Sequence, residues 1–234
     1  MPAMKPAPLA GYIDSTNLRL DATDADLRTL CADARRYALA AVMLYPASVP
    51  LAADALAGSA VRVGTVIGFP HGRAPTAAKE AEIRAVAAAG AHEVDIVMNY
   101  PDLREGRRAA VAAELGRLAA EAHALHLLVK VIVETCYLDR AQKLAALAVC
   151  EDAGADFIKT STGFGAAGAT VDDVKLFADH RRGAIRIKAA GGIKTLAQAR
   201  ALIAAGAGRL GTSSAAALVQ EDAGGQVPAP SGSY

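Results

Sequence analysis

The stretch Ala153-Gly-Ala-Asp-Phe-Ile-Lys159-Thr-Ser-Thr-Gly163 joins the end of a predicted helix to a short apolar strand and a loop of small polar residues. Glycine fits the left-handed backbone position that ends a helix, and alanine lets the chain pass close to the next strand. The same order of helix end, Gly-Ala and strand recurs at Ala89-Gly-Ala-His-Glu-Val-Asp95 and at Ala205-Gly-Ala-Gly-Arg-Leu-Gly211. This recurrence indicates a chain built from repeated strand–helix units.

Eight strand-like runs alternate with amphipathic, alanine-rich segments along the chain. The predicted strands span residues 11–14, 41–45, 61–69, 93–99, 127–134, 156–160, 185–190 and 209–211. The predicted helices span residues 24–39, 48–56, 75–89, 103–125, 139–153, 171–180 and 196–205, and a short final helix starts at Ser213 and Ser214. Asp24, Thr76 and Thr170 are the predicted N-caps, because their side chains can accept hydrogen bonds from the first helical turn.

Strand–helix units of this length imply parallel strands with right-handed crossovers. Eight such units favour the α/β fold of a closed (β/α)8 TIM barrel. An open doubly wound sheet is the alternative, but no glycine-rich dinucleotide fingerprint follows the first strand. We therefore predict one barrel domain over residues 1–220. Residues 221–234 have the Gly, Pro and Ser content of a flexible C-terminal tail.

Composition excludes several classes of function. The 234 residues are 53% hydrophobic and carry a formal net charge of +1, so there is no electrostatic case for nucleic acid or an anionic membrane as partner. We find neither a transmembrane stretch nor a signal peptide. Three cysteines without CxxC spacing indicate reduced thiols and a cytoplasmic protein. The five histidines show no ligand spacing, so we predict no metal site.

Three ionisable residues stand inside otherwise apolar strands: Asp95, Lys159 and Lys188. Each alone could be a structural barrel charge held in an ion pair, but in a barrel the three can converge in one cavity. A lysine that loses its proton is a nucleophile toward carbonyls, a second lysine lowers the pKa of the first, and a carboxylate can carry protons between them. The set therefore predicts Schiff-base chemistry on a carbonyl, with the choice of nucleophile between Lys159 and Lys188 left open.

Features suited to phosphate follow the last two strands, which is the usual phosphate site of this fold. The segments are Gly191-Gly192 and Gly211-Thr-Ser213-Ser214, with Gly163 and Lys194 as predicted neighbours. Glycine loops and helix N-termini bind anions through backbone N–H groups. The predicted substrate is therefore a small phosphorylated aldehyde or sugar.

Softer candidates end three other strands. Asp14 and Thr16 end the first strand, where they can bind a substrate hydroxyl or cap the next helix. His71 follows the third strand as a second acid/base candidate. Glu134 ends the fifth strand and is a candidate partner for one of the lysines.

With these residues assembled, the sequence resembles the deoxyribose-phosphate aldolase family of class I aldolases over about residues 10 to 220. The resemblance rests on seven motifs in order: Ile13-Asp-Ser-Thr-Asn-Leu18, Val66-Ile-Gly-Phe-Pro70, Glu93-Val-Asp95-Ile-Val, Lys130-Val-Ile-Val-Glu-Thr135, Asp156-Phe-Ile-Lys159-Thr-Ser-Thr-Gly163, Ile187-Lys188-Ala-Ala-Gly-Gly192 and Gly211-Thr-Ser-Ser214. The fifth and sixth of these are highly specific to the family.

The resemblance implies that Lys159 forms the Schiff base, that Lys188 perturbs it and relays protons, and that Asp95 is the acid/base carboxylate acting through a water. The implied reaction is the reversible cleavage of 2-deoxy-D-ribose 5-phosphate to D-glyceraldehyde 3-phosphate and acetaldehyde, without metal or cofactor. Many members use a C-terminal tyrosine that folds into the site, a placement that Tyr234 matches. Members are often dimers or higher homo-oligomers.

Two positions depart from the family pattern: Ser15 stands where histidine is usual, and Met43 where cysteine is common. Neither belongs to the Schiff-base residues, so we expect the activity to survive. The competing interpretations are another Schiff-base barrel, such as a transaldolase or a keto-acid aldolase, and a catalytically silent barrel that binds phosphate.

Overall fold

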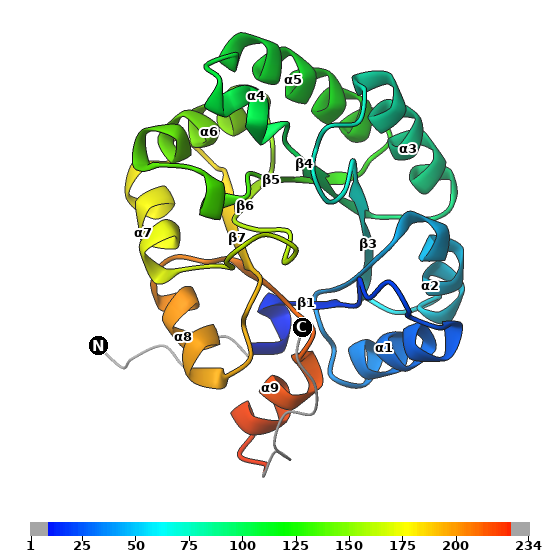
Figure 1. The fold of residues 1–234 in the computed structure, drawn as a ribbon. Coiled ribbons are helices and arrows are strands. Elements are labelled where there is room, and N and C mark those ends of the chain that lie inside the picture. Colours follow the sequence, from blue (N-terminus) through cyan, green and yellow to red (C-terminus); the bar gives the residue numbers. More distant parts are fainter. Residues whose placement is uncertain (1–8, 226–234) are drawn as a thin grey trace.

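Eight parallel strands close into one barrel in the computed structural model, which describes residues 9–225 (Figure 1). The strands are β1 (Ile13–Thr16), β2 (Ala41–Leu44), β3 (Arg62–Ile67), β4 (Glu93–Val97), β5 (Leu128–Ile132), β6 (Phe157–Lys159), β7 (Arg186–Ala190) and β8 (Arg209–Thr212). Each strand pairs with the next, and β8 pairs with β1. The predicted (β/α)8 barrel is confirmed.

The helices surround the strands as an outer layer (Figure 1). They are α1 (Asp24–Arg36), α2 (Val49–Ala55), α3 (Thr76–Ala88), α4 (Tyr100–Arg104), α5 (Arg108–Ala124), α6 (Arg140–Asp152), α7 (Val171–His180), α8 (Leu196–Ala204) and α9 (Ala215–Asp222). Short 3₁₀ turns occupy Leu9–Tyr12, Pro46–Ser48 and Thr135–Tyr137. Within residues 9–225, none of these helices is long and apolar enough to cross a membrane.

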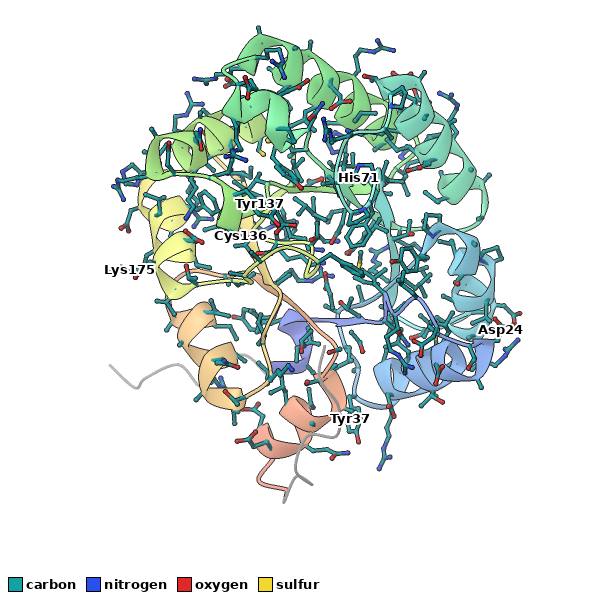
Figure 2. All side chains as sticks on the ribbon, in the orientation of Figure 1. Asp24, Tyr37, His71, Cys136, Tyr137 and Lys175 are labelled. Carbon is teal, nitrogen blue, oxygen red and sulfur yellow. The ribbon has the colours of Figure 1, made fainter. Side chains whose placement is uncertain are left out.

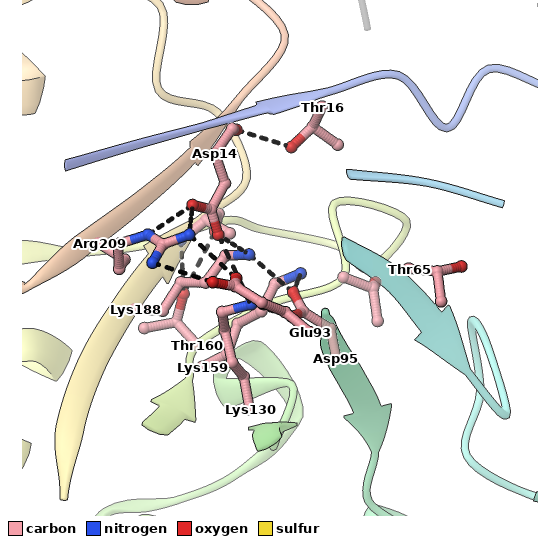
Figure 3. Close-up of polar contacts among 12 residues, drawn as sticks. Asp14, Thr16, Thr65, Glu93, Asp95, Lys130, Lys159, Thr160, Lys188 and Arg209 are labelled. Atoms are coloured by element: carbon pink, nitrogen blue, oxygen red, sulfur yellow. Dashed lines mark hydrogen bonds and ion pairs between the residues drawn. The ribbon is translucent and has the colours of Figure 1, made fainter. Parts of the chain in front are cut away.

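Alternation along each strand separates two environments. In β4, the buried Val94 and Ile96 belong to the apolar core that includes buried residues of the surrounding helices. The residues between and before them, Asp95 and Glu93, face the inside of the barrel (Figure 3). The barrel interior therefore receives the ionisable side chains, while the aliphatic core lies between strands and helices.

Several predicted boundaries differ from those of the structure. The helix predicted over residues 103–125 is two helices, α4 and α5, because Gly106 has a left-handed φ of 79° and ends the first. Helix α1 is capped by Thr23, with Asp24 as its first helical residue, and the N-cap of α3 is Pro75, one residue before Thr76. The predicted cap at Thr170 is confirmed, since its hydroxyl accepts a hydrogen bond from Asp173 N at 3.0 Å.

The last helix, α9, packs beside the start of the chain. Its Gln220 donates a hydrogen bond of 2.5 Å to the hydroxyl of Tyr37, which lies next to α9 in Figure 2. Helix α9 ends at Asp222, so the first two residues of the predicted tail, Glu221 and Asp222, are helical. Tyr234 lies outside the described residues.

Candidate active site

Seven ionisable side chains meet inside the barrel (Figure 3). They come from six of the eight strands and comprise three carboxylates and four cations: Asp14, Glu93, Asp95, Lys130, Lys159, Lys188 and Arg209. Charged groups are seldom buried unless they are paired, because removing them from water is costly. A cluster of this size in a barrel interior is therefore a functional candidate.

Asp95 is the centre of the cluster. Its Oδ2 accepts hydrogen bonds from Lys159 Nζ and from Lys188 Nζ, both at 2.7 Å. Its Oδ1 accepts one from Lys130 Nζ at 2.9 Å. Parallel pairing explains the convergence, because Asp95 lies opposite Lys130 across β4 and β5, and Lys159 lies opposite Lys188 across β6 and β7. The three residues predicted to converge are brought together.

The two lysines differ in access. The side chain of Lys159 is 4% exposed and has one carboxylate partner, Asp95. The side chain of Lys188 is fully buried and lies between two carboxylates, Asp95 and Asp14, whose Oδ2 is 2.5 Å from Lys188 Nζ. Lys159 is therefore the more accessible of the two lysines.

A second group of contacts lies deeper in the barrel. Arg209 donates to Asp14 Oδ1 from Nε at 2.5 Å and to Glu93 Oε2 from Nη2 at 3.0 Å. Lys130 Nζ donates to Glu93 Oε2 at 2.6 Å. Asp14, which was predicted to bind substrate, is thus fully buried and held by cations of the cluster. Thr16 is half-buried, and its hydroxyl donates to the backbone carbonyl of Asp14, two residues earlier, at 3.0 Å.

These contacts shift the protonation equilibria. The pKa of Lys188 is lowered to about 8, because burial and the nearby Lys159 and Lys130 outweigh the attraction of Asp14 and Asp95. Burial opposes ionisation of Asp95, but its three lysine partners outweigh burial and hold its pKa well below the usual value. Burial also disfavours the charged form of Lys130, yet the surrounding carboxylates raise its pKa. The cluster thus holds a permanent carboxylate beside a lysine that titrates near neutral pH.

The predicted phosphate residues surround the ends of β6, β7 and β8. Gly163, Gly191 and Gly192 all have left-handed φ values, of 89°, 87° and 75°. The loop after β6, which crosses in front of the barrel opening in Figure 1, packs against the loop after β7. A Cβ on Gly168 would lie 2.1 Å from Gly191 O, and Ala169 N donates to that oxygen at 3.1 Å.

The remaining phosphate candidates line the last strand end and the turn before α8. Ser214 is the N-cap of α9, and its N–H donates to Thr212 Oγ1 at 2.9 Å. Ser213 and Lys194 are exposed. The side chain of Ser161, next to Gly191, is buried without a hydrogen-bond partner among the described residues. The two loops therefore offer backbone donors and a free hydroxyl on the β6–β8 side of the opening.

Contrary to the prediction, Glu134 forms no salt bridge with a lysine of residues 9–225. Its carboxylate accepts hydrogen bonds from the backbone N–H of Thr162 at 3.3 Å and from the Thr162 hydroxyl. Glu134 is buried, has a left-handed φ of 53°, and has its pKa raised by burial. Residues in this strained conformation tend to mark functional sites. Here Glu134 fixes the start of the loop that carries Gly163.

An apolar wall faces the charged side of the opening. Met43, Leu18 and Val66 form a small buried cluster of their own, with Tyr45 and Phe69 packed against it. The ring of Phe164, 42% exposed, stands edge-on to Phe69 at 5.2 Å. Met43 fits because β3 has a glycine beside it: a Cβ on Gly64 would lie 2.3 Å from the methionine sulfur.

Other predicted positions lie away from the cluster. His71 is exposed in the loop after β3, where its Nδ1 accepts from Arg73 N at 3.1 Å. Ser15 is buried on the strand next to Asp14. Among residues 9–225, no group of three or more His, Cys, Asp or Glu side chains could hold a metal ion.

Sequence reasoning gave no role to Lys130, Glu93 or Arg209. Lys130 carried a usable signal, because it is a lysine inside the apolar run Leu127-Leu-Val-Lys-Val-Ile-Val133, as Lys159 and Lys188 are in theirs. Glu93 and Arg209 stand at the starts of their strands, where a charged residue is commonly solvated, so only the barrel shows that they meet.

Known proteins are similar to this chain in sequence and in fold. The model of the DeoC/LacD family aldolases matches residues 9–220. A deoxyribose-phosphate aldolase of Deinococcus radiodurans is 47% identical over 211 residues, which are 90% of this chain and 95% of the relative. One from Thermococcus gammatolerans is 44% identical over 214 residues, 91% of this chain and 95% of the relative. The solved structure of an Aeropyrum pernix deoxyribose phosphate aldolase, described as tetrameric, superposes with a TM-score of 0.85 at 34% identity and covers 91% of this chain and 90% of its own.

Proposed function

The chain belongs to the DeoC/LacD aldolase family, and from that premise we propose how its residues divide the work of the reaction. The protein is an enzyme, a carbon–carbon lyase that reversibly cleaves 2-deoxy-D-ribose 5-phosphate to D-glyceraldehyde 3-phosphate and acetaldehyde. This reaction belongs to the catabolism of deoxyribonucleotides. What remains to be assigned is the role of each side chain.

Lys159 is the Schiff-base lysine. The observation that carries this assignment is the difference in access, since Lys159 is 4% exposed with one carboxylate partner whereas Lys188 is fully buried between two. The neutral amine of Lys159 attacks the C1 aldehyde of the open-chain sugar, and loss of water gives the iminium. The C2–C3 bond then breaks, its electron pair moves into the iminium to form an enamine, and the C3 hydroxyl loses its proton as glyceraldehyde 3-phosphate leaves.

Asp95 and Lys188 handle the protons. The enamine takes a proton at C2, and water then hydrolyses the new iminium to release acetaldehyde and regenerate the amine. Asp95 Oδ2 is shared by both lysines at 2.7 Å, so a proton can pass between Lys159 and Lys188 through one oxygen. With a water at this carboxylate, Asp95 accepts the C3 hydroxyl proton and returns a proton to C2.

The phosphate binds on the β6–β8 side of the opening. Gly163, Gly191 and Gly192 supply backbone donors in left-handed turns, and Ser213 and Ser214 supply the start of α9. Lys194 adds a cation near the same loops. Asp14 and Thr16, which were predicted to bind substrate, both lie on β1. Asp14 contributes to the site through its direct contact with Lys188.

We also infer that the enzyme is a cytoplasmic homo-oligomer, a dimer or higher. The support is the tetramer described for the Aeropyrum pernix relative and the three free cysteines of this chain. Light scattering behind gel filtration tests the first part: a mass of one chain at micromolar concentration would contradict it.

Reduction with borohydride in the presence of 2-deoxy-D-ribose 5-phosphate, followed by peptide mass mapping, tests the assignment of the lysines. We expect a reduced adduct on Lys159. An adduct on Lys188 would keep the reaction but exchange the two lysines. No adduct in the folded protein would contradict Schiff-base chemistry.

A further inference from the structure

The buried cluster contains one more cation than it has carboxylates. Excess charge in a low-dielectric interior is costly, and the cluster relieves it when one lysine loses its proton. Two members of the cluster, Glu93 and Arg209, lie apart from the proposed chemistry. Each makes its contacts with residues of the cluster other than Lys159 and Lys188.

Arg209 acts on the lysine pair through Asp14. Its guanidinium holds Asp14 Oδ1, while the other oxygen of the same carboxylate holds Lys188. The more of the negative charge of Asp14 that Arg209 neutralises, the less remains to keep Lys188 protonated. Arg209 therefore favours release of the proton.

Glu93 acts on the lysine pair through Lys130, and its effect on proton release is opposite to that of Arg209. Its Oε2 is 2.6 Å from Lys130 Nζ, and the same ammonium holds Asp95 Oδ1 at 2.9 Å. The more of the charge of Lys130 that Glu93 neutralises, the more the negative charge of Asp95 acts on Lys159 and Lys188. Glu93 therefore favours retention of the proton.

Glu93 and Arg209 lie away from the end of the barrel where the substrate enters. Glu93 begins β4, two residues before Asp95, and Arg209 begins β8, so both side chains start below the carboxyl ends where the site opens. Their side chains are 4% and 11% exposed. The salt bridge between them, at 3.0 Å, links the two contact chains into one deep layer.

We propose that the Glu93–Arg209 ion pair is a positioning element that sets the charge balance of the Lys159–Asp95–Lys188 centre and so selects the neutral amine. The proposal rests on the Schiff-base function described above. The charged groups that face the lysine pair are Asp14 from β1, Asp95 from β4, Lys130 from β5 and, beyond the strand end, Glu134. Strands β2 and β3 carry one ionisable residue, Arg62, which is exposed at the start of β3.

The test is the pH dependence of kcat/KM for 2-deoxy-D-ribose 5-phosphate in four variants, each checked for its thermal unfolding midpoint. The acid limb is the part of the profile in which kcat/KM rises with pH as a lysine loses its proton. In Arg209→Gln this limb should move up by about one pH unit, because loss of a positive charge raises the proton affinity of the lysines. In Glu93→Gln it should move down by about one pH unit, because loss of a negative charge lowers that affinity. In Arg209→Lys, which keeps the charge, and in the double variant Glu93→Gln/Arg209→Gln, which keeps the balance, the limb should stay near that of wild type.

Opposite shifts that cancel in the double variant cannot come from a general loss of structure, which would lower the plateau of all variants without moving their limbs. Unmoved limbs in both single variants, or shifts of the same sign, would overturn the proposal. If Arg209→Gln does not fold, the downward shift of Glu93→Gln and its reversal in the double variant decide the question alone. Failure of the proposed function is distinguishable, because wild type itself would then give neither turnover nor a reduced adduct.

Discussion

Lys159 and Lys188 donate hydrogen bonds to the same oxygen, Asp95 Oδ2, each at 2.7 Å. Two ammonium groups on one oxygen repel each other, and the third lysine at Asp95 Oδ1 adds to that repulsion. The arrangement therefore favours a state in which one of the pair is neutral. Since the shared oxygen connects them, loss of one proton from the pair can leave either amine neutral.

Replacing Lys159 by alanine should abolish turnover of 2-deoxy-D-ribose 5-phosphate. The protein should remain folded, because Asp95 keeps Lys130 and Lys188 as partners. The measurement is release of acetaldehyde together with borohydride trapping. Lys175→Ala on the outer surface of α7 is the matched control and should behave as wild type (Figure 2). Substantial turnover in Lys159→Ala would contradict the mechanism.

The value of kcat/KM should rise with pH through about 8, the pKa to which burial lowers Lys188. The sign follows from the chemistry: as pH rises the Lys159–Lys188 pair loses a proton, and Asp95 Oδ2, which both nitrogens contact, lets the neutral and reactive amine be that of Lys159. Asp95→Asn removes the negative charge that the lysines share and should reduce kcat by about 100-fold or more, because an amide cannot act as the acid/base group. A flat profile between neutral and alkaline pH would show that no lysine titrates in this range.

The sequence predicted the fold because each strand–helix unit carries its own local signals. The Gly-Ala that follows three of the helices, and the apolar run at each strand, are properties of neighbouring residues, so eight strand–helix units could be counted without a structure. The errors are also local, since Asp24 and Thr76 have cap-forming side chains but stand one residue too late. The break at Gly106 was missed because good helix formers stand on both sides of it, arginine and glutamate before it and arginine after it.

Contacts across the barrel were beyond the sequence. Asp14 and Arg209 meet only because β8 closes onto β1. A buried lysine is not in itself a sign of chemistry, as Lys79 shows: it lies on α3, fully buried, and donates to two backbone carbonyls and to Glu114. Which buried lysines share a carboxylate, and which one remains accessible, follows from the strand register and from the shape of the opening.

Tyr234→Phe should slow exchange of the methyl protons of acetaldehyde with solvent and leave phosphate binding unchanged. The expectation rests on the family resemblance, in which a C-terminal tyrosine helps to move that proton. Proton NMR of acetaldehyde in D₂O measures the exchange rate, and the inhibition constant of inorganic phosphate is the control. Exchange as fast as in wild type would show that this hydroxyl takes no part.

Aldehydes that alkylate thiols should inactivate the enzyme slowly, because Met43 replaces the cysteine that family members commonly carry in the pocket. The remaining reaction should occur at Cys136, which is half-buried near the opening, whereas Cys31 and Cys150 are buried with raised pKa values (Figure 2). Activity after prolonged exposure to acetaldehyde, compared between wild type and Cys136→Ser, measures this. Equal inactivation of the two proteins would assign the damage elsewhere.

Gly168→Ala should weaken binding of phosphorylated substrates selectively. The added methyl group would lie 2.1 Å from Gly191 O, so the loops after β6 and β7 must separate, and with them the backbone donors of Gly163 and Gly191. We expect KM for 2-deoxy-D-ribose 5-phosphate to rise by about tenfold, equivalent to about 1.4 kcal/mol of lost binding. Trapping of acetaldehyde, which carries no phosphate, should change much less.

Gly116→Ala is the matched control for that change, because a Cβ there has no neighbour within 4 Å and the residue lies inside α5. Alanine in a helix interior should stabilise the fold by about 0.5–1 kcal/mol and leave KM unchanged. An equal loss of acetaldehyde trapping and of phosphorylated-substrate binding in Gly168→Ala would mean that the loop supports the lysine centre as a whole. An unchanged KM would mean that the phosphate binds away from the contact between these two loops.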